Sequence, residues 1–189
     1  MTANNARAEQ AMREFLEALG VDLTARGMER TPARVAQMYA FLFNGMGRST
    51  EDIWGETFTT GSDGLVAVRH IPFYSMCEHH LVPFFGTVDI AYIPRHGRVA
   101  GFSKFTTLVE RLAHQPQLQE RLTAQIARAV EHDLQAVGVL VKVEALQLCM
   151  TMRGDMAPGT RTVTSEATGV CREDHALYQQ AWLALGGEK

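Results

Sequence analysis

The stretch GLVAVRHIPFYSMCEHHLVPFFGTVDIAYIP, residues 64–94, predicts the centre of the fold. Residues 64–74 and residues 84–94 each predict a strand, and the turn-like sequence Cys-Glu-His-His lies between them. Two strands joined by a turn form an antiparallel pair. We therefore expect the rest of the domain to be arranged around this pair.

The flanking segments predict helices before the pair, and helices followed by strands after it. Apolar residues recur there at three- and four-residue spacing, and Thr31-Pro32 supplies an N-cap with proline at the first helical position. The predicted helices are 5–19, 31 to about 45, 103–113, 116–136 and 172–185, and the further strands are 138–150 and 161–168. This order predicts an α+β domain with an antiparallel sheet at 61–189, preceded by a helical arm and connector at 1–60.

Composition excludes several classes of protein. Of the 189 residues, 46% are hydrophobic and 21% are charged, which predicts a packed core rather than disorder. A net charge of −3 argues against binding to nucleic acid or to an anionic membrane. No apolar run approaches the roughly 20 residues of a bilayer span, and residues 1–10 lack the apolar region of a secretory signal. Three widely spaced cysteines fit a reducing cytoplasm better than a disulfide framework.

The Cys-Glu-His-His turn contains a candidate metal site. Cys77 and His80 have the spacing that lets one turn present a thiolate and an imidazole to one ion. Alternation along the strand 138–150 puts Gln147 and Cys149 on the same inward face. Two cysteines and one histidine form a plausible zinc site with an open fourth position, where bound water has a pKa near 7. The alternative is that Cys77 and Cys149 are buried core thiols and the histidines are surface residues.

Other polar residues have both a functional and a structural interpretation. His79 is a candidate general acid or an ordinary loop histidine. Glu120 is a candidate ligand-binding carboxylate or a favourable charge at a helix N-terminus. Ser103 and Lys104 begin a helix and could hold an anion, or serve as a plain cap with a solvated lysine. Arg153 could hold a phosphate or lie in a surface turn.

Several segments of the chain, in unbroken order, resemble the GTP cyclohydrolase I family. The matching segments are TPARVAQMY (31–39), SMCEHHLVPFFG (75–86), IAYIPRHGRVAGFSK (90–104), PQLQERLTAQIARA (116–129) and CMTMRG (149–154). The resemblance implies a T-fold, in which an antiparallel sheet carries a helix pair, at 61–189. It also implies a toroidal homodecamer with active sites between subunits.

The resemblance implies roles for the candidate residues. The zinc ligands are Cys77, His80 and Cys149, and His79 assists proton transfer at the imidazole ring of the purine. Gln119 and Glu120 grip the guanine edge, and a carboxylate that faces two N–H donors is a specific anchor. Residues around the ribose and phosphates are Ser103, as a further catalytic candidate, Lys104 and Arg153. The family reaction opens the imidazole ring by attack at C8, releases formate and closes a dihydropterin ring.

Four positions depart from the pattern of the family. Gln147 replaces a histidine that lies two residues before the second cysteine ligand. Gln37, Thr107 and Gln115 replace three cations, whereas Arg34 is kept as a candidate substrate contact. The zinc and guanine-edge positions are all present, which indicates a diverged paralogue that retains the first hydrolysis.

Three functions follow from this pattern. The first is a zinc hydrolase that acts on GTP or a less phosphorylated guanine nucleotide and stops at the ring-opened formamidopyrimidine. The second is a complete GTP cyclohydrolase I, which yields 7,8-dihydroneopterin triphosphate and formate. The third is a non-catalytic family member that binds a purine or pterin, or acts as a scaffold.

Overall fold

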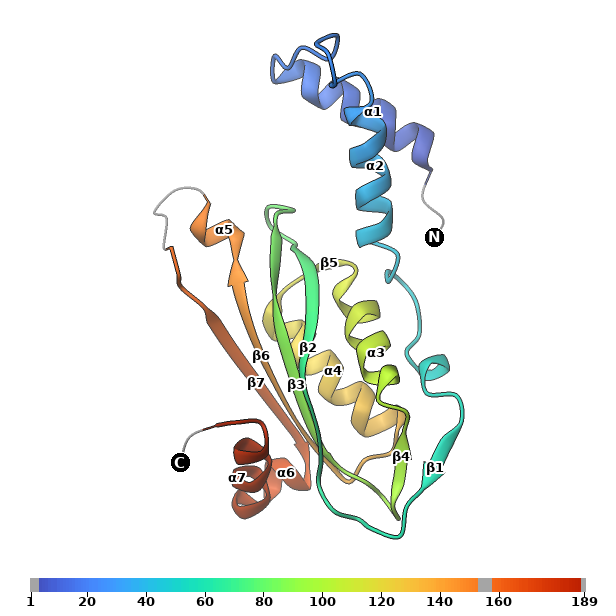
Figure 1. The fold of residues 1–189 in the computed structure, drawn as a ribbon, viewed down its shortest axis with the longest axis vertical. Helices are drawn as coiled ribbons and strands as arrows, with labels where there is room; N and C mark the ends of the chain where they lie inside the picture. Colours follow the sequence, from blue (N-terminus) through green and yellow to red (C-terminus); the bar gives the residue numbers. More distant parts are fainter. Residues whose placement is uncertain (1–3, 153–157, 188–189) are drawn as a thin grey trace.

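The computed structural model describes residues 4–152 and 158–187. Its centre is a five-stranded sheet with the order β5-β2-β3-β6-β7 (Figure 1). The strands are β2 (Val66–Cys77), β3 (Pro83–Ile93), β5 (Pro116–Gln117), β6 (Gly138–Gln147) and β7 (Thr162–Gly169). All neighbouring strands are antiparallel except β5, which runs parallel to the end of β2. The pair predicted from residues 64–94 therefore lies inside the sheet.

Two helices, α3 (Ser103–Ala113) and α4 (Gln119–Asp133), cover one face of this sheet (Figure 1). The apolar stripe predicted for the longer helix is buried there, with Leu122, Ile126 and Val130 fully covered. These side chains join the inward residues of β3 and β6 in the main core. On the other face, α6 (Val170–Glu173) and α7 (His175–Ala184) pack against the sheet around a second, smaller core. The predicted α+β class and the T-fold arrangement of sheet and helix pair are confirmed.

An arm of two helices, α1 (Asn5–Ala18) and α2 (Thr31–Leu42), extends beyond the sheet domain (Figure 1). Helix α1 buries none of its residues, and Phe15 and Phe41 of the arm are more than half exposed. The segment predicted as a connector contains the short helix η1 (Glu51–Ile53) and β1 (Thr57–Thr59). Strand β1 pairs with β4 (Arg98–Ala100) in a separate two-stranded sheet. No helix among the described residues is long and apolar enough to cross a membrane.

Several predicted boundaries were wrong. The first strand of the central pair runs on to Cys77, and Thr31 is the first residue of α2 rather than its N-cap. Three further differences have a clear cause. Residues 116 and 117 form β5 instead of beginning a helix, because they pair with the end of β2, and α4 begins at Gln119. The strand at 138–150 ends at Gln147, where the chain turns into α5 (Leu148–Thr151). The terminal helix is divided into α6 and α7, because the Asp174 side chain accepts hydrogen bonds from two backbone N–H groups and starts a new helix.

Candidate functional site

The turn between β2 and β3 is held in place by other elements. Within the turn, Leu81 N–H donates to the Cys77 carbonyl at 2.8 Å, and Leu81 has a positive φ of 51°. Glu78 N–H donates to the Gln117 carbonyl of β5 at 3.1 Å. The Tyr39 hydroxyl of α2 donates to the Leu81 carbonyl at 3.0 Å. Contacts from the arm and from β5 therefore fix the backbone that carries the predicted metal ligands.

The three predicted zinc ligands lie together. One donor atom from each of Cys77, His80 and Cys149 lies within 4.8 Å of the others, and Cys77 Sγ is 3.9 Å from His80 Nδ1. On a tetrahedral zinc ion, bonds of about 2.0–2.3 Å place such atoms about 3.5–3.8 Å apart. The observed spacing is therefore close to what one ion needs. Cys77 is buried and His80 is exposed, so the cluster is open on one side.

Cys149 reaches this cluster by a different backbone path from the one predicted. Alternation along residues 138–150 predicted that the strand continues to Cys149, but this residue lies in the one-turn helix α5. The turn still brings its thiol to the end of β6, where Cys149 Sγ is 4.0 Å from Gln147 Oε1. The two residues therefore meet as predicted, through a change of backbone direction rather than a shared strand face.

The third cysteine has a different environment. Cys171 is fully buried in the smaller core, and burial raises the pKa of its thiol to about 11. A thiol in such surroundings stays protonated near neutral pH and does not act as a metal ligand or nucleophile. Cys171 is therefore a structural residue.

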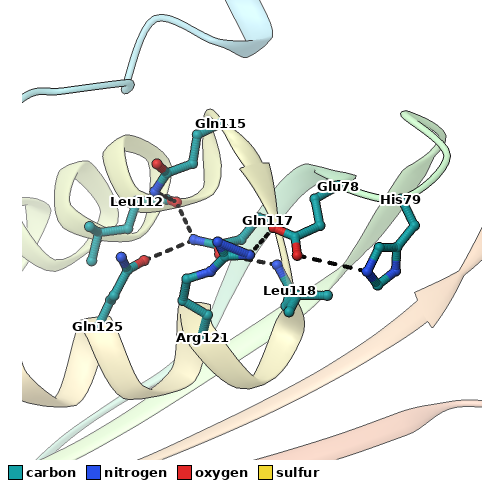
Figure 2. A network of polar contacts seen from close by, with 8 residues as sticks. All are labelled: Glu78, His79, Leu112, Gln115, Gln117, Leu118, Arg121 and Gln125. Carbon is teal, nitrogen blue, oxygen red and sulfur yellow. Dashed lines mark hydrogen bonds and ion pairs between the residues drawn. The ribbon is translucent and has the colours of Figure 1, made fainter.

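His79 lies at the outer side of the turn, with a side chain 65% exposed (Figure 2). Its Nε2 is 3.8 Å from Glu78 Oε1, and the other carboxylate oxygen of Glu78 forms an ion pair with Arg121 of α4. Neither Arg121 nor Glu78 was predicted as a site residue, although they lie in the matching segments 116–129 and 75–86. Their ion pair joins the turn to α4 next to the candidate general acid.

Glutamine side chains fill the junction of α3, β5 and α4 behind this ion pair (Figure 2). Gln117 Nε2 donates to the Leu112 carbonyl at 3.0 Å and to Gln125 Oε1 at 2.9 Å, while Gln117 Oε1 accepts from Leu118 N–H. Gln115 Nε2 donates to the same Leu112 carbonyl at 3.0 Å. Gln115 replaces a cation of the family pattern, and its side-chain amide is hydrogen-bonded to the C-terminal end of α3.

The two predicted guanine-edge residues have contrasting surroundings. Gln119 is buried, and its Nε2 donates to the carbonyls of Val143 at 3.1 Å and Thr162 at 3.0 Å. Its Oε1 accepts from Gln147 Nε2 at 2.7 Å. Glu120, one residue further on, is exposed in the first turn of α4, and no described residue forms a hydrogen bond or ion pair with it.

The predicted anion-binding pair lies far from the metal cluster within one chain. Ser103 and Lys104 begin α3, whereas the carbonyl of Ala113 at its other end accepts a hydrogen bond from Ser75 Oγ of β2 at 2.6 Å. Ser75 is two residues from Cys77, and an 11-residue helix spans about 15 Å between its first and last residues. The structure therefore does not bring Ser103 and Lys104 together with the metal ligands of the same chain.

The remaining phosphate-side candidates are also dispersed. Arg34 is exposed on α2, as is Gln37. The Thr107 hydroxyl, at another position where the family pattern has a cation, donates to the Ser103 carbonyl of its own helix at 3.1 Å. Arg153 lies outside the described residues.

The chain is similar to known proteins over almost its full length. The family model for GTP cyclohydrolase I matches residues 8–185. GTP cyclohydrolase 1 of Streptococcus agalactiae serotype V is 47% identical over 94% of this chain and 95% of the relative. GTP cyclohydrolase 1 of Desulforamulus reducens is 48% identical over 93% of this chain and 94% of the relative. The crystal structure of the archaeosine synthase QueF-Like in the apo form aligns with 57% of this chain and 96% of that chain, at 21% identity and a TM-score of 0.48. With its Cys-His-Cys cluster between the β2–β3 turn and α5, the chain belongs to the GTP cyclohydrolase I family.

Proposed function

We propose that this protein is a zinc-dependent cyclohydrolase that opens the imidazole ring of a guanine nucleotide by attack at C8. The observation that carries the proposal is the convergence of donor atoms from Cys77, His80 and Cys149 within 4.8 Å, with His79 in the same turn. Relatives named GTP cyclohydrolase 1, at 47–48% identity over nearly the whole chain, support the substrate class.

The donor set suits zinc, since two thiolates and an imidazole form a common catalytic zinc site with one open position. When bound, zinc supplies Lewis acidity and a source of hydroxide near neutral pH. The two thiolates of Cys77 and Cys149 balance the double positive charge of such an ion. The open side at His80 leaves room for a ligand to approach.

The chain's own side chains supply recognition and proton transfer. The exposed carboxylate of Glu120 can accept hydrogen bonds from the two N–H donors on the guanine edge, and leaving those groups unpaired would be costly. His79 can deliver a proton to the purine imidazole ring. Glu78, which forms an ion pair with Arg121, lies 3.8 Å from His79 Nε2 and gives a protonated His79 a nearby negative charge (Figure 2).

The finer proposal is that the reaction accumulates the ring-opened formamidopyrimidine. Gln147 lies beside the cluster where the family pattern has a histidine, and an amide cannot exchange a proton near neutral pH. The second hydrolysis must protonate a poor amine leaving group, so it depends most on a proton donor at this position. A second candidate, the complete reaction to 7,8-dihydroneopterin triphosphate and formate, is favoured by the names of the relatives.

A further part of the proposal is a shared active site in a cytoplasmic homo-oligomer, with the decamer as the expected size. Ser103 and Lys104 lie at the far end of α3 from the cluster of their own chain, so in this proposal a neighbouring copy supplies the phosphate contacts of these two residues. The exposed apolar side chains of the arm, including Phe15 and Phe41, give such a copy a surface to cover.

The zinc-loaded protein should be incubated separately with GTP, GDP, GMP and guanosine, and both ultraviolet spectra and formate should be measured. Loss of the purine spectrum without formate supports accumulation of the ring-opened product, whereas a pterin chromophore with formate supports the complete reaction. Because Gln37, Thr107 and Gln115 replace cations, we expect GTP and GMP to differ by less than several orders of magnitude in kcat/KM. No change with any of the four compounds would refute the proposed function, and C149A is the matched inactive control.

A further inference from the structure

The orientation of two amide side chains beside the metal cluster follows from their hydrogen-bond partners. Gln119 Nε2 faces the carbonyls of Val143 and Thr162, which can only accept hydrogen bonds. The nitrogen of Gln119 must therefore be on that side, and its oxygen must face Gln147. The two carbonyls, together with Thr164 Oγ1 at 3.3 Å, occupy both N–H bonds of this amide.

The orientation of Gln147 follows in turn. An amide oxygen only accepts, so the 2.7 Å contact requires Gln147 Nε2 to donate to Gln119 Oε1. The carbonyl oxygen of Gln147 is then left on the side of Cys149, 4.0 Å from its Sγ. Only one orientation of the Gln119 and Gln147 amides is therefore consistent with all of these hydrogen bonds.

We infer that Gln119 is a positioning residue, which fixes Gln147 so that its carbonyl oxygen acts as a hydrogen-bond acceptor at the cluster. This inference rests on the proposed function and assigns Gln119 a different task from the guanine contact implied by the family resemblance. Gln119 is only 3% exposed and has no amide hydrogen left for a substrate. Guanine-edge recognition then falls to the exposed carboxylate of Glu120.

The same geometry determines what position 147 can do. A carbonyl oxygen accepts from an N–H group or a water at the cluster and cannot supply a proton to it. A neutral histidine at position 147 could donate one ring N–H to Gln119 Oε1 and keep the other ring nitrogen as an acceptor. Glutamine therefore reproduces the direction of the hydrogen bonds of a histidine while removing its capacity to exchange a proton.

The first test is structural and independent of any ligand. Crystal structures should be determined for Q119M and for Q125M, which removes an amide from the same helix within the network of Figure 2. We expect the Gln147 side chain to leave its position in Q119M and to keep it in Q125M. An unchanged Gln147 in Q119M would overturn the inference. If Q119M does not fold, Q147M provides the kinetic comparison with Gln119 left anchored.

The second test separates positioning from direct contact with guanine. Binding of GTP to the metal-free protein should be measured by calorimetry for Q119M and E120Q. We expect the Kd of Q119M to stay within about twofold of the unsubstituted protein, and that of E120Q to rise roughly tenfold or more, as for loss of a hydrogen bond to a charged group. A Kd that rises as much in Q119M as in E120Q would overturn the inference.

The third test uses kinetics. Q119M and Q147M should each lower kcat roughly two- to tenfold, the loss expected for one hydrogen bond, with little change in KM. The double variant should lose no more than either single one, because Gln119 acts only through Gln147. Additive losses would contradict this role. If the unsubstituted protein neither binds nor converts a guanine nucleotide, the proposed function fails, while the crystal structures still decide the positioning role.

Discussion

The two ends of α3 differ in how much of an active site one chain builds. At the C-terminal end, ligands from the β2–β3 turn and from α5 meet within 4.8 Å although 69 residues separate His80 from Cys149. At the N-terminal end, Ser103 and Lys104 face no metal ligand of their own chain. The comparison indicates that the three candidate metal ligands come from a single chain, whereas our proposal assigns the phosphate contacts of Ser103 and Lys104 to a second copy.

The largest expected effect comes from removing one candidate metal ligand at the C-terminal end of α3. C149A should bind almost no zinc, whereas the unsubstituted protein should bind one ion per chain, because two ligands cannot hold the ion that three hold. Metal analysis of purified protein and the loss of nucleotide conversion check this. C171A is the matched control and should keep full zinc content, since its thiol is buried in a separate core. Full zinc occupancy in C149A would sink the assignment of Cys149.

The next effect concerns the chemistry at the same end. Q147H should restore formate release by about 10²–10⁴-fold, the usual contribution of general acid–base assistance. The ring-opened intermediate should then disappear from the ultraviolet spectrum. Rapid formate production by the unsubstituted protein, with no change in Q147H, would mean that an imidazole was never needed at this position.

A smaller effect tests the other end of α3. K104A should lower kcat/KM for GTP roughly 10- to 150-fold, the value of one charge-assisted contact to phosphate. If the site is shared, mixing K104A and C149A chains by co-expression should regain activity that neither variant has alone, because some sites then combine two intact halves. Activity no higher than that of K104A alone would argue that each chain uses its own lysine.

The smallest expected effect is a pH dependence at the cluster end of α3. Burial lowers the pKa of His114 in spite of the nearby Glu110 carboxylate, so the folded state binds this proton less readily than the unfolded chain does. The lowered pKa of His114 therefore makes the folded state relatively more stable when this side chain is neutral. This stability is fully present above the unfolded-state pKa of about 6.5 and declines as the pH falls below it. H114Q should therefore lose less thermal stability than the unsubstituted protein between pH 7.5 and pH 5.5. Equal slopes of Tm against pH would contradict the assignment.

The sequence predicts most of the sheet because local patterns determine it. The strands around residues 64–94 and the apolar stripe of α4 both follow from periodicity. Strand β5 was missed because a two-residue strand has no period, and only its pairing with Cys77 and Met76 reveals it. The end of β6 at Gln147 was missed for a similar reason, since residues 148–150 continue the apolar pattern into α5.

The sequence predicts some contacts of the candidate site and misses others. Cys77 and His80 are close because they share a turn, and their spacing predicts it. The burial of Gln119 and its bond to Gln147 join residues 28 apart in sequence, and no short pattern encodes them. The ion pair between Glu78 and Arg121 cannot be predicted for the same reason. In the sequence both residues resemble ordinary surface charges, and only the packing of the turn against α4 brings them together.

The anchoring of the β2–β3 turn has a consequence for metal exchange. The Gln117 carbonyl of β5 and the Tyr39 hydroxyl fix the turn through backbone groups of Glu78 and Leu81, and neither contact involves the side chain of a candidate metal ligand. A chelator should therefore remove the proposed zinc ion while the turn keeps its shape, so that little ordering would be needed for zinc to bind again. Such a preformed turn should favour rapid reloading, and it should allow cobalt to replace the proposed zinc as a spectroscopic probe without unfolding of the chain.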